Sequence, residues 1–356
     1  EDSAMIGRAS GRDLVSMNNI ELCNLPWLCH NYWLQYRYSM DGSMLKDRIY
    51  PLLRRSISYY LHHIEEREDG SLHLGISVSP EYHTNARDTN INLALLRWSC
   101  LTLITISEKL ELEDPLIPKL KDLQKRLADF PVDQNGLMIG EGVPFDSSHR
   151  HYSHLLGIYP LYILNRDHED YCSLINKSID HWCSLDMEFA GYSYTGAASL
   201  YAAAGDGERA YSYIIEFLDK VPVFNTMYLE HINWGGGGHT LETPLTFASS
   251  VHDMLLQSWG GKIRVFPAVP GSWNDIIFSG LRAEGAFLVN AERKDGRTIH
   301  ISVTSEAGEP CIIQTDMAEL EIFVNGSKAE WCWLHEGCLK VDLAAGETAV
   351  LKLMVV

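Results

Sequence analysis

The chain lacks the features that mark several large classes of protein. None of its eight cysteines forms a Cys-x-x-Cys pair, which argues against a zinc ribbon or a thioredoxin-type site. No uncharged apolar run reaches 18 residues, so no segment is expected to span a membrane. Positive charge is scarce, with 29 Lys and Arg against 47 Asp and Glu and a net charge of −18. Such a surface would be repelled by nucleic acid and by anionic membranes, and neither is expected as a partner.

The composition is that of a globular protein. Of the 356 residues, 46% are hydrophobic and 21% charged, so the chain can bury a full core and suits one large domain with a smaller one. The start, Glu1-Asp2-Ser3, shows no signal-peptide pattern. We expect the mature or truncated form of a secreted or periplasmic protein; the oligomeric state is left open.

The first 260 residues show apolar positions at helical spacing, and helix-start signals punctuate them. Asp114-Pro115 and Thr243-Pro244 each offer an N-cap followed by proline. We expect helices over nine segments: 25–38, 44–66, 88–109, 114–130, 150–163, 169–185, 193–204, 207–219 and 243–258.

From about Lys262 the pattern becomes that of short strands. Asp295-Gly296 and Asn325-Gly326 each follow a strand-like run, which is the strongest short signal for a β-hairpin. We therefore expect an α-helical domain over residues 1–260 and a small β-sandwich domain over residues 261–356, with no low-complexity linker between them.

The order of the helices predicts an α/α toroid. If consecutive helices run antiparallel, every second helix begins on the same side of the molecule. Segment 88–109 is apolar nearly all round, as an inner helix would be, whereas 114–130 carries many charges, as an outer helix would. Nine helices, five inner and four outer, fall short of the twelve in six pairs, so we expect the chain to begin inside the barrel.

Three loops that this order brings to one rim carry the residues suited to acid and base chemistry. Glu81 precedes the 88–109 helix, and Glu242 precedes the 243–258 helix. Between them lies a run with three imidazoles, His149, His151 and His154. Two carboxylates and several imidazoles at one mouth predict a catalytic pocket.

At these motifs the sequence resembles the catalytic region of glycoside hydrolase family 95, whose members are inverting α-L-fucosidases and α-L-galactosidases. The resemblance rests on Ser79-Pro80-Glu81, the histidine run through Tyr159-Pro160, Gly191-Tyr192-Ser193, and Met254-Leu255-Leu256-Gln257-Ser258. It implies an (α/α)6 toroid of the six-hairpin glycosidase type followed by a β domain, and no cofactor.

The resemblance also implies roles for the two glutamates. Glu81 matches the family's general acid, and counting back from Met254 places Glu242 on the catalytic aspartate that helps activate water. Glutamate at this position departs from the family, because its side chain is one methylene longer than that of aspartate. A second departure is the absence of an Asn-x-Asn before Tyr32-Trp33. Either Asn24 or Asn31 serves instead, or the water is held differently, or the site is not active as in the family.

Inverting hydrolysis needs one protonated carboxyl and one base, roughly 6.5–9.5 Å apart. Glu242 lies beside a predicted helix start, whose dipole favours the ionised base, although such a carboxylate can equally be a simple helix-end charge. Glu81, beside Tyr82, would be held protonated by an apolar lining; the bland alternative is a solvated loop acid.

The remaining site residues are expected to bind substrate. We assign sugar-hydroxyl binding to His149, His151 and His154, with helix capping or a metal site as alternatives and no metal in the preferred assignment. Asn31, Tyr192 and Trp234 complete the predicted set. Trp234, beside the Gly235–Gly238 run, has the setting of a loop aromatic that can stack on a sugar.

We therefore expect a hydrolase that releases terminal α-L-fucosyl or α-L-galactosyl residues from an oligosaccharide or polysaccharide. Two alternatives stay open: a polysaccharide lyase on the same kind of toroid, and a non-catalytic sugar-binding relative, which the missing asparagine pair favours.

Overall fold

The computed structural model describes residues 22–80, 82, 84–221, 241–335 and 337–354, which form two compact units. The first unit joins Glu1–Trp33 to Gly42–Phe189, and the second joins Leu34–Asp41 to Ala190–Val356. Helix α1 (Asn24–Ser39) therefore contributes its first part to one unit and its last residues to the other.

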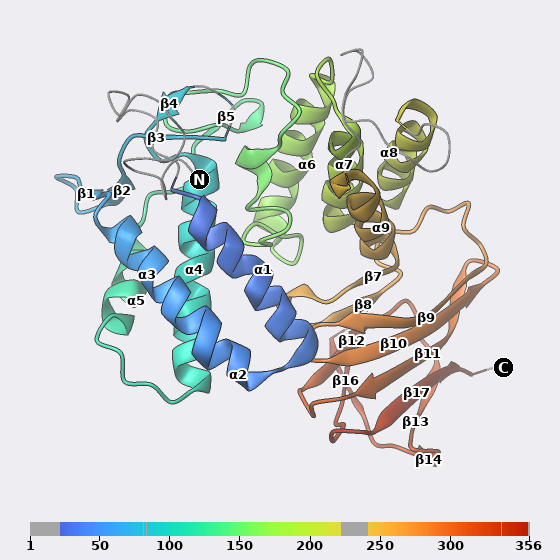
Figure 1. Ribbon diagram of the computed structural model, residues 1–356. Coiled ribbons are helices and arrows are strands. Elements are labelled where there is room, and N and C mark those ends of the chain that lie inside the picture. The colour runs from blue at the N-terminus through green and yellow to red at the C-terminus, as the bar shows by residue number, and fades with distance from the viewer. Residues whose placement is uncertain (1–21, 81, 83, 222–240, 336, 355–356) are drawn as a thin grey trace. The chain divides into compact units, whose positions relative to one another are not determined.

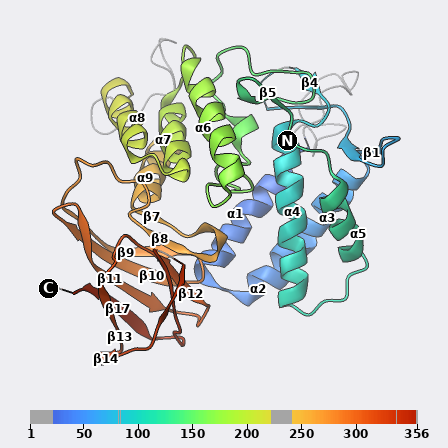
Figure 2. The ribbon, with the colours of Figure 1, turned by 180° about the vertical axis from the view of Figure 1, so that it is seen from behind.

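The first unit is organised around helix α4 (Asn90–Lys109), which contacts α3 (Tyr50–Leu61) and α5 (Ile117–Arg126) (Figure 2). Most of α4 is buried, as its nearly continuous apolar sequence predicts, whereas α5 buries only Leu120 and Leu123. The short α2 (Gly42–Met44) and a π-helical turn, Leu45–Ile49, lead into α3. The predicted contrast between a buried and an exposed helix is confirmed for this pair.

Three short hairpins in the first unit were not predicted. Their strands are β1 (Ile64–Glu66) with β2 (Leu72–Leu74), β3 (Ser77–Val78) with β4 (Asn85–Ala86), and β5 (Val132–Asp133) with β6 (Gly136–Leu137). Strands of two or three residues leave too little alternation of polar and apolar residues to be recognised in a sequence.

The predicted helix over 150–163 is wrong. Apart from one 3-10 turn at Ser153–Leu155, this stretch is irregular, and the next helix is α6 (Glu169–Ser184). Gly157 and Pro160 explain the difference, because glycine weakens a helix and proline lacks the N–H that the helix ladder requires.

Asp114 caps a turn rather than a helix. Its Oδ1 accepts a hydrogen bond from the backbone N–H of Leu116 at 2.9 Å, and α5 begins only at Ile117. Asp114 therefore lies three residues before the first residue of α5 and is not its N-cap. Arg54 holds the pKa of the Asp114 carboxyl at about 2, chiefly through the hydrogen bond to it.

The second unit begins with three helices packed on one another, α7 (Gly191–Ala204), α8 (Gly207–Lys220) and α9 (Glu242–Leu255). Small residues let α7 approach α9 closely. A Cβ added at Gly191 would come within 2.7 Å of the Thr243 side chain, and Thr195 Oγ1 donates to Thr246 Oγ1 at 2.8 Å. The sequence of α7, rich in Gly, Ala, Ser and Thr, makes this approach possible.

Two sheets follow the helices and share one apolar core (Figure 1). The six-stranded sheet has the order β14-β13-β17-β11-β10-β9 and the five-stranded sheet the order β15-β16-β12-β8-β7. Their bounds are β7 (Leu256–Gln257), β8 (Ile263–Val265), β9 (Ile276–Ala283), β10 (Phe287–Lys294), β11 (Arg297–Ser305), β12 (Cys311–Gln314), β13 (Leu320–Val324), β14 (Ser327–Lys328), β15 (Cys332–His335), β16 (Cys338–Val341) and β17 (Thr348–Leu353).

Both predicted hairpin turns are confirmed. Asp295-Gly296 joins β10 to β11, with φ of 49° and 74°. Asn325-Gly326 joins β13 to β14, with φ of 50° and 84°. Two consecutive residues with positive φ form the tight turn that fits the twist of paired strands.

The end of α1 is fixed to the second unit by a partly buried ion pair. Arg37 Nε lies 2.9 Å from Glu284 Oε2, with side-chain exposures of 19% and 16%, and the Arg37 carbonyl accepts from Gly285 N at 2.8 Å. Burial raises the pKa of Glu284, while Arg37 and then Arg264 oppose that rise. These bonds explain why residues 34–41 group with strands more than two hundred positions away.

The predicted domain boundary at 260 is not tested by this division and stays a prediction.

All eight cysteines are thiols, including Cys332 and Cys338, which lie on the adjacent strands β15 and β16. Among the described residues, no helix combines the length and apolar character that a membrane crossing requires.

Replacing Arg37 with Met is expected to destabilise the protein by about 3 kcal/mol, because Glu284 would keep a poorly solvated charge without its cation. The double variant R37M/E284Q should recover part of that loss. Thermal or urea unfolding followed by tryptophan fluorescence measures both. The matched control is Lys328→Met, which breaks an exposed pair with Glu321 and should cost less than about 1 kcal/mol. Equal effects of the two single variants would refute the role of Arg37.

His30 should make the protein sensitive to acid. It is 3% exposed against Trp98, and burial lowers its pKa to about 4. Below pH 6.5 the unfolded chain binds a proton at this position that the folded chain refuses, so stability should fall by about 1.4 kcal/mol per pH unit down to pH 4. His30→Phe should remove that part of the slope in urea unfolding, whereas His62→Phe, at an exposed position, should not. Parallel slopes for all three proteins would contradict the assignment.

Candidate active site

The segments on both sides of position 81 are held against the histidine run. Glu81 itself lies outside the described residues, in the connection between β3 and β4. Ser79, which is fully buried, has its Oγ 2.7 Å from Ser153 Oγ. The Tyr82 ring lies 5.6 Å from that of Phe145 and 5.8 Å from that of His149. The sequence neighbours of Glu81 and the run from 149 to 154 are therefore in contact.

Hydrogen bonds at Tyr82 reinforce this contact. Its hydroxyl accepts from the backbone N–H of Asp146 at 3.2 Å and lies 3.2 Å from Ser147 Oγ. The Tyr82 side chain is thus held against the segment that precedes the histidine run.

The three histidines lie in an irregular segment with its own internal bonds. His149 Nδ1 accepts from the backbone N–H of His151 at 3.0 Å, and the His149 carbonyl accepts from Trp182 Nε1 at 3.2 Å. The rings of His149 and His151 are 5.1 Å apart. These bonds give the segment a defined shape around the single 3-10 turn at Ser153–Leu155.

His154 lies in surroundings that favour the neutral imidazole. It is 2% exposed and stacks on Phe145, with ring centroids 4.5 Å apart and planes 14° apart. Burial, followed by the nearby His181 and His149, lowers its pKa to about 3. Its Nδ1 makes no hydrogen bond within the described part of the chain. A neutral imidazole can donate or accept a hydrogen bond but carries no charge to attract a carboxylate.

Glu242 and Tyr192 lie at neighbouring helix starts in the second unit. Glu242 is the first residue of α9 and is exposed, and Tyr192 is the second residue of α7 and is half-buried. The close contact of Gly191 with Thr243 brings these two helix ends together. Glu242 was expected just ahead of the helix; it instead forms part of the first turn of α9.

Asn31 is an exposed residue of α1, one position after the buried His30. Trp234 lies outside the described residues. The structure thus brings the flanks of position 81 together with the three histidines, and Tyr192 together with Glu242. That all of them share one cavity stays a prediction.

A buried polar network near the hairpin β3–β4 escaped the sequence analysis. Asn92 Oδ1 accepts from Tyr60 OH at 2.9 Å, and Asn92 Nδ2 donates to Thr89 Oγ1 at 2.7 Å and to Ser77 Oγ at 3.1 Å. All four side chains are fully buried. The available signal was an asparagine in an otherwise apolar helix sequence. We call Tyr60, Ser77, Thr89 and Asn92 the Asn92 network.

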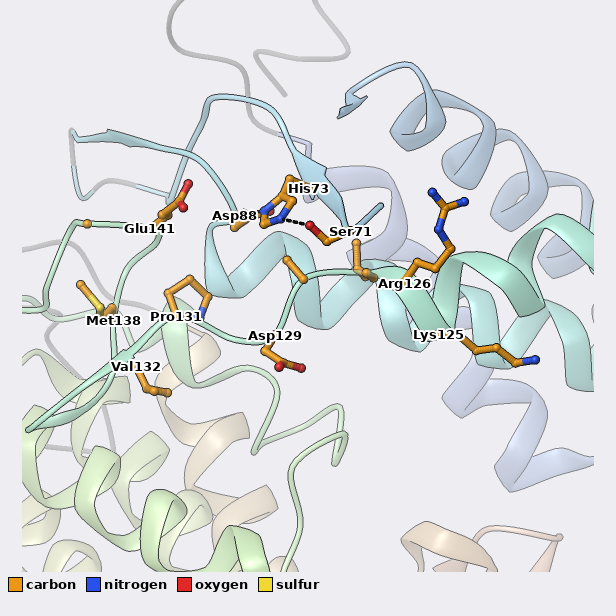
Figure 3. A pocket seen from close by; sticks show the side chains of 13 residues that line it. Ser71, His73, Asp88, Lys125, Arg126, Asp129, Pro131, Val132, Met138 and Glu141 are labelled. Carbon is orange, nitrogen blue, oxygen red and sulfur yellow. Dashed lines mark hydrogen bonds and ion pairs between the residues drawn. The ribbon is translucent and has the colours of Figure 1, made fainter. Parts of the chain in front are cut away.

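A second polar cluster lines a cavity of about 590 Å³ (Figure 3). His73 Nδ1 lies 2.5 Å from Asp88 Oδ2, and its Nε2 lies 2.9 Å from Ser71 Oγ. Asp88 Oδ1 also accepts from the backbone N–H of Leu74 at 2.7 Å. No predicted site residue lines this cavity. Among the described residues, no three His, Cys, Asp or Glu side chains are grouped as metal ligands.

Comparison with known families matches the chain over most of its length. The model of the glycosyl hydrolase family 95 catalytic domain matches residues 5–254, and that of the glycoside hydrolase family 95 C-terminal domain matches residues 257–351. The chain is 27% identical over 305 residues to alpha-L-fucosidase 2 of Arabidopsis thaliana, which covers 79% of this chain and 35% of the relative. The chain thus spans about a third of the relative's length.

Among solved structures, a putative kojibiose phosphorylase from the human microbiome is similar, with a TM-score of 0.54 and 10% identity. The match covers 92% of this chain and 46% of the other. At this identity the likeness bears on the fold alone. The predicted fold class is confirmed: a helical domain of the six-hairpin glycosidase type precedes a β-rich C-terminal domain. On the match of both family models, the chain belongs to glycoside hydrolase family 95.

Proposed function

We propose that this chain carries the catalytic region of an inverting glycosidase that releases terminal α-L-fucosyl or α-L-galactosyl residues from oligosaccharides or polysaccharides. The supporting observation is the contact between the flanks of Glu81 and the histidine run, through Ser79–Ser153 and Tyr82–His149, in a chain of this family. Glu81 is the proton donor and Glu242 the base.

The proposed roles follow from the family resemblance, in which Glu81 matches the general acid and Glu242 the residue that helps activate water. Glu242 lies in the exposed first turn of α9, open to the water from which the proposed base would take a proton. Tyr82, the residue that follows Glu81 in the sequence, packs against Phe145 with ring centroids 5.6 Å apart. One acid and one base, held in opposite protonation states, are what a single displacement by water at the anomeric carbon requires.

The histidines and aromatic residues bind the sugar in this proposal. Neutral His154 can exchange hydrogen bonds with hydroxyl groups without altering the charge of the pocket, and His149 and His151 extend the same segment. Asn31 takes the part of the missing asparagine pair, and Tyr192 and Trp234 provide stacking surface. A secreted or periplasmic location stays a prediction that cell fractionation would test.

The acid role of Glu81 predicts a dependence on the leaving group. Glu81→Gln should lower kcat/KM for a fucosyl or galactosyl disaccharide by about 10³-fold, because a sugar alkoxide cannot leave without a proton. The same variant should lose less than about tenfold on the corresponding glycosyl fluoride, whose leaving group needs little protonation. Glu242→Gln should lower both by similar factors, since water must be activated in either case. Steady-state kinetics on both substrates measures the contrast, and Glu169→Gln, an acid in the first turn of α6, is the control. Equal losses on both substrates for Glu81→Gln would remove it as the acid.

The stereochemical course provides an independent test. Proton NMR during the first turnovers should show the β-anomer of the released sugar, because a single displacement inverts the configuration. Initial release of the α-anomer would exclude the inverting mechanism. A product that absorbs in the ultraviolet as an unsaturated uronide would identify the lyase alternative, and binding without turnover would identify the non-catalytic one.

A further inference from the structure

Ser71, His73 and Asp88 form a chain of hydrogen bonds outside the candidate active site. Asp88 Oδ2 lies 2.5 Å from His73 Nδ1, and His73 Nε2 lies 2.9 Å from Ser71 Oγ. Figure 3 shows His73 between Asp88 and Ser71 at the wall of the cavity. A hydroxyl, an imidazole and a carboxylate in this order, with each ring nitrogen facing one partner, are the arrangement that activates a serine as a nucleophile.

The hairpin β1–β2 holds the first two members of this chain. Ser71 directly precedes β2 and His73 is its second residue, so the alternation along a strand directs both side chains to one face. The turn before β2 is closed by the Arg67 N–H, which donates to the Ser71 carbonyl at 3.0 Å. Asp88 Oδ1 accepts from the backbone N–H of Leu74 at 2.7 Å, which leaves Oδ2 for the imidazole.

Exposure decreases along the chain from the hydroxyl to the carboxylate. Ser71 is half-buried, His73 is 9% exposed and Asp88 is 2% exposed. A buried carboxylate that faces Nδ1 favours the tautomer with its proton on that nitrogen, so Nε2 can accept the proton of the hydroxyl. The same carboxylate stabilises the imidazolium that this transfer creates.

A fourth group, Asp69, competes for the proton of Ser71. Asp69 Oδ1 lies 2.5 Å from Ser71 Oγ and also accepts the Ser71 backbone N–H at 2.9 Å. The hydroxyl thus has one proton and two acceptors, an exposed carboxylate and the Nε2 atom of His73. Directed to Asp69, the proton leaves the serine at rest; directed to His73, it leaves the oxygen ready to attack.

The cavity of about 590 Å³ that Ser71 lines suits a small uncharged molecule. Part of its wall is apolar and is formed by Pro131, Val132 and Met138 (Figure 3). Its other charged side chains carry both signs, so the lining selects neither an anion nor a cation; they are Lys125, Arg126, Asp129 and Glu141. A neutral carboxylic ester with a short acyl chain fits this lining.

Arg126 provides positive charge close to the nucleophile. Its Nε donates to the carbonyl of Gly70, the residue before Ser71, at 2.9 Å. The other nitrogens of its guanidinium pair with Glu66 and Asp122, which fix its orientation. A cation held in this way can stabilise the oxyanion that forms when a nucleophile adds to an ester carbonyl.

We propose that Ser71 is the nucleophile of a second hydrolytic site, which cleaves small carboxylic esters with His73 as the base and Asp88 as the group that orients it. Ser71 Oγ bonds to the carbonyl carbon while its proton passes to His73 Nε2. The bond from that carbon to the alcohol oxygen breaks, and the alcohol leaves with the proton. Water then adds to the acyl-serine and gives a proton to His73, which returns it to Ser71 as the acid departs. This site uses none of the residues assigned to the glycosidase.

A fluorophosphonate probe tests the nucleophile directly, because Ser71 Oγ would displace fluoride from phosphorus and keep the phosphonate. Mass spectrometry of the full chain and of its peptides should find one phosphonate, on Ser71. Ser71→Ala should abolish this labelling and lower kcat/KM for p-nitrophenyl acetate by about 10²-fold or more. The matched control is Ser212→Ala, whose hydroxyl bonds only to the Arg209 carbonyl among the described groups and which should label like the original protein.

Variants of the partners test the rest of the chain. His73→Gln keeps a polar side chain but cannot take up a proton, so it should slow labelling by about 10²-fold. Asp88→Asn keeps the acceptor for Leu74 N–H and loses the charge beside the ring, and should slow labelling by about 10- to 100-fold. Asp69→Asn should instead speed it by about two- to fivefold, because a neutral amide is a weaker competitor for the hydroxyl proton.

The labelled position and the response of His73 decide between the outcomes. The proposal fails if no phosphonate is found on Ser71, or if His73→Gln labels at the original rate. A loss in Asp69→Asn as large as that in His73→Gln would make Asp69 the base and would refute the triad. Melting temperatures of Ser71→Ala and His73→Gln within about 4 °C of the original would show that lost labelling is not lost folding. Labelling does not depend on glycosidase turnover, so the two functions can fail separately.

Discussion

Hydrogen bonds made by one buried amide are the constraint on which the first unit depends. Asn92 lies in a helix whose neighbouring side chains Ile91, Leu93 and Ala94 are buried and apolar. A buried polar group left without partners costs about 1–3 kcal/mol, so the amide is tolerated only while Tyr60 and the two hydroxyls occupy their places. An apolar residue would fill the space but would not distinguish one position of β3 from another. The network therefore supplies geometric precision more than net stability.

The second unit relies on charge in a comparable way. Arg37 and Glu284 come from opposite ends of the sequence, and their pairing fixes the end of α1 beside the turn between β9 and β10. Burial raises the pKa of the Glu284 carboxyl. Burial of the Tyr38 side chain likewise raises the pKa of its hydroxyl to about 12. A carboxylate that has lost part of its hydration needs a cation beside it, because water cannot reach the site to replace that cation. The pair is therefore specific for these two residues.

The sequence predicted what depends on local repetition. The long apolar helix α4 and the Asp295-Gly296 turn are each specified by residues close together in the sequence, and both were predicted. The segment 150–163 was misjudged because its apolar spacing suggests a helix, while Gly157 and Pro160 oppose one. The hairpins and the Asn92 network could not be predicted, since each depends on residues brought together only by folding. For the same reason, the motif positions of Glu81 and the histidines were accessible through a family resemblance, but their contacts through Ser79 and Tyr82 were not.

The neutrality of His154 bears on which chemistry the pocket can support. A lyase mechanism with histidine as proton carrier needs an imidazole that titrates near the working pH. Burial lowers the pKa of His154 to about 3, well below the range that this role needs. Its stacking on Phe145 fixes the ring, which suits a group that orients a hydroxyl and does not suit one that must change charge. Burial and stacking of His154 therefore argue against it as the proton carrier of a lyase, and its role in binding a sugar stays a prediction.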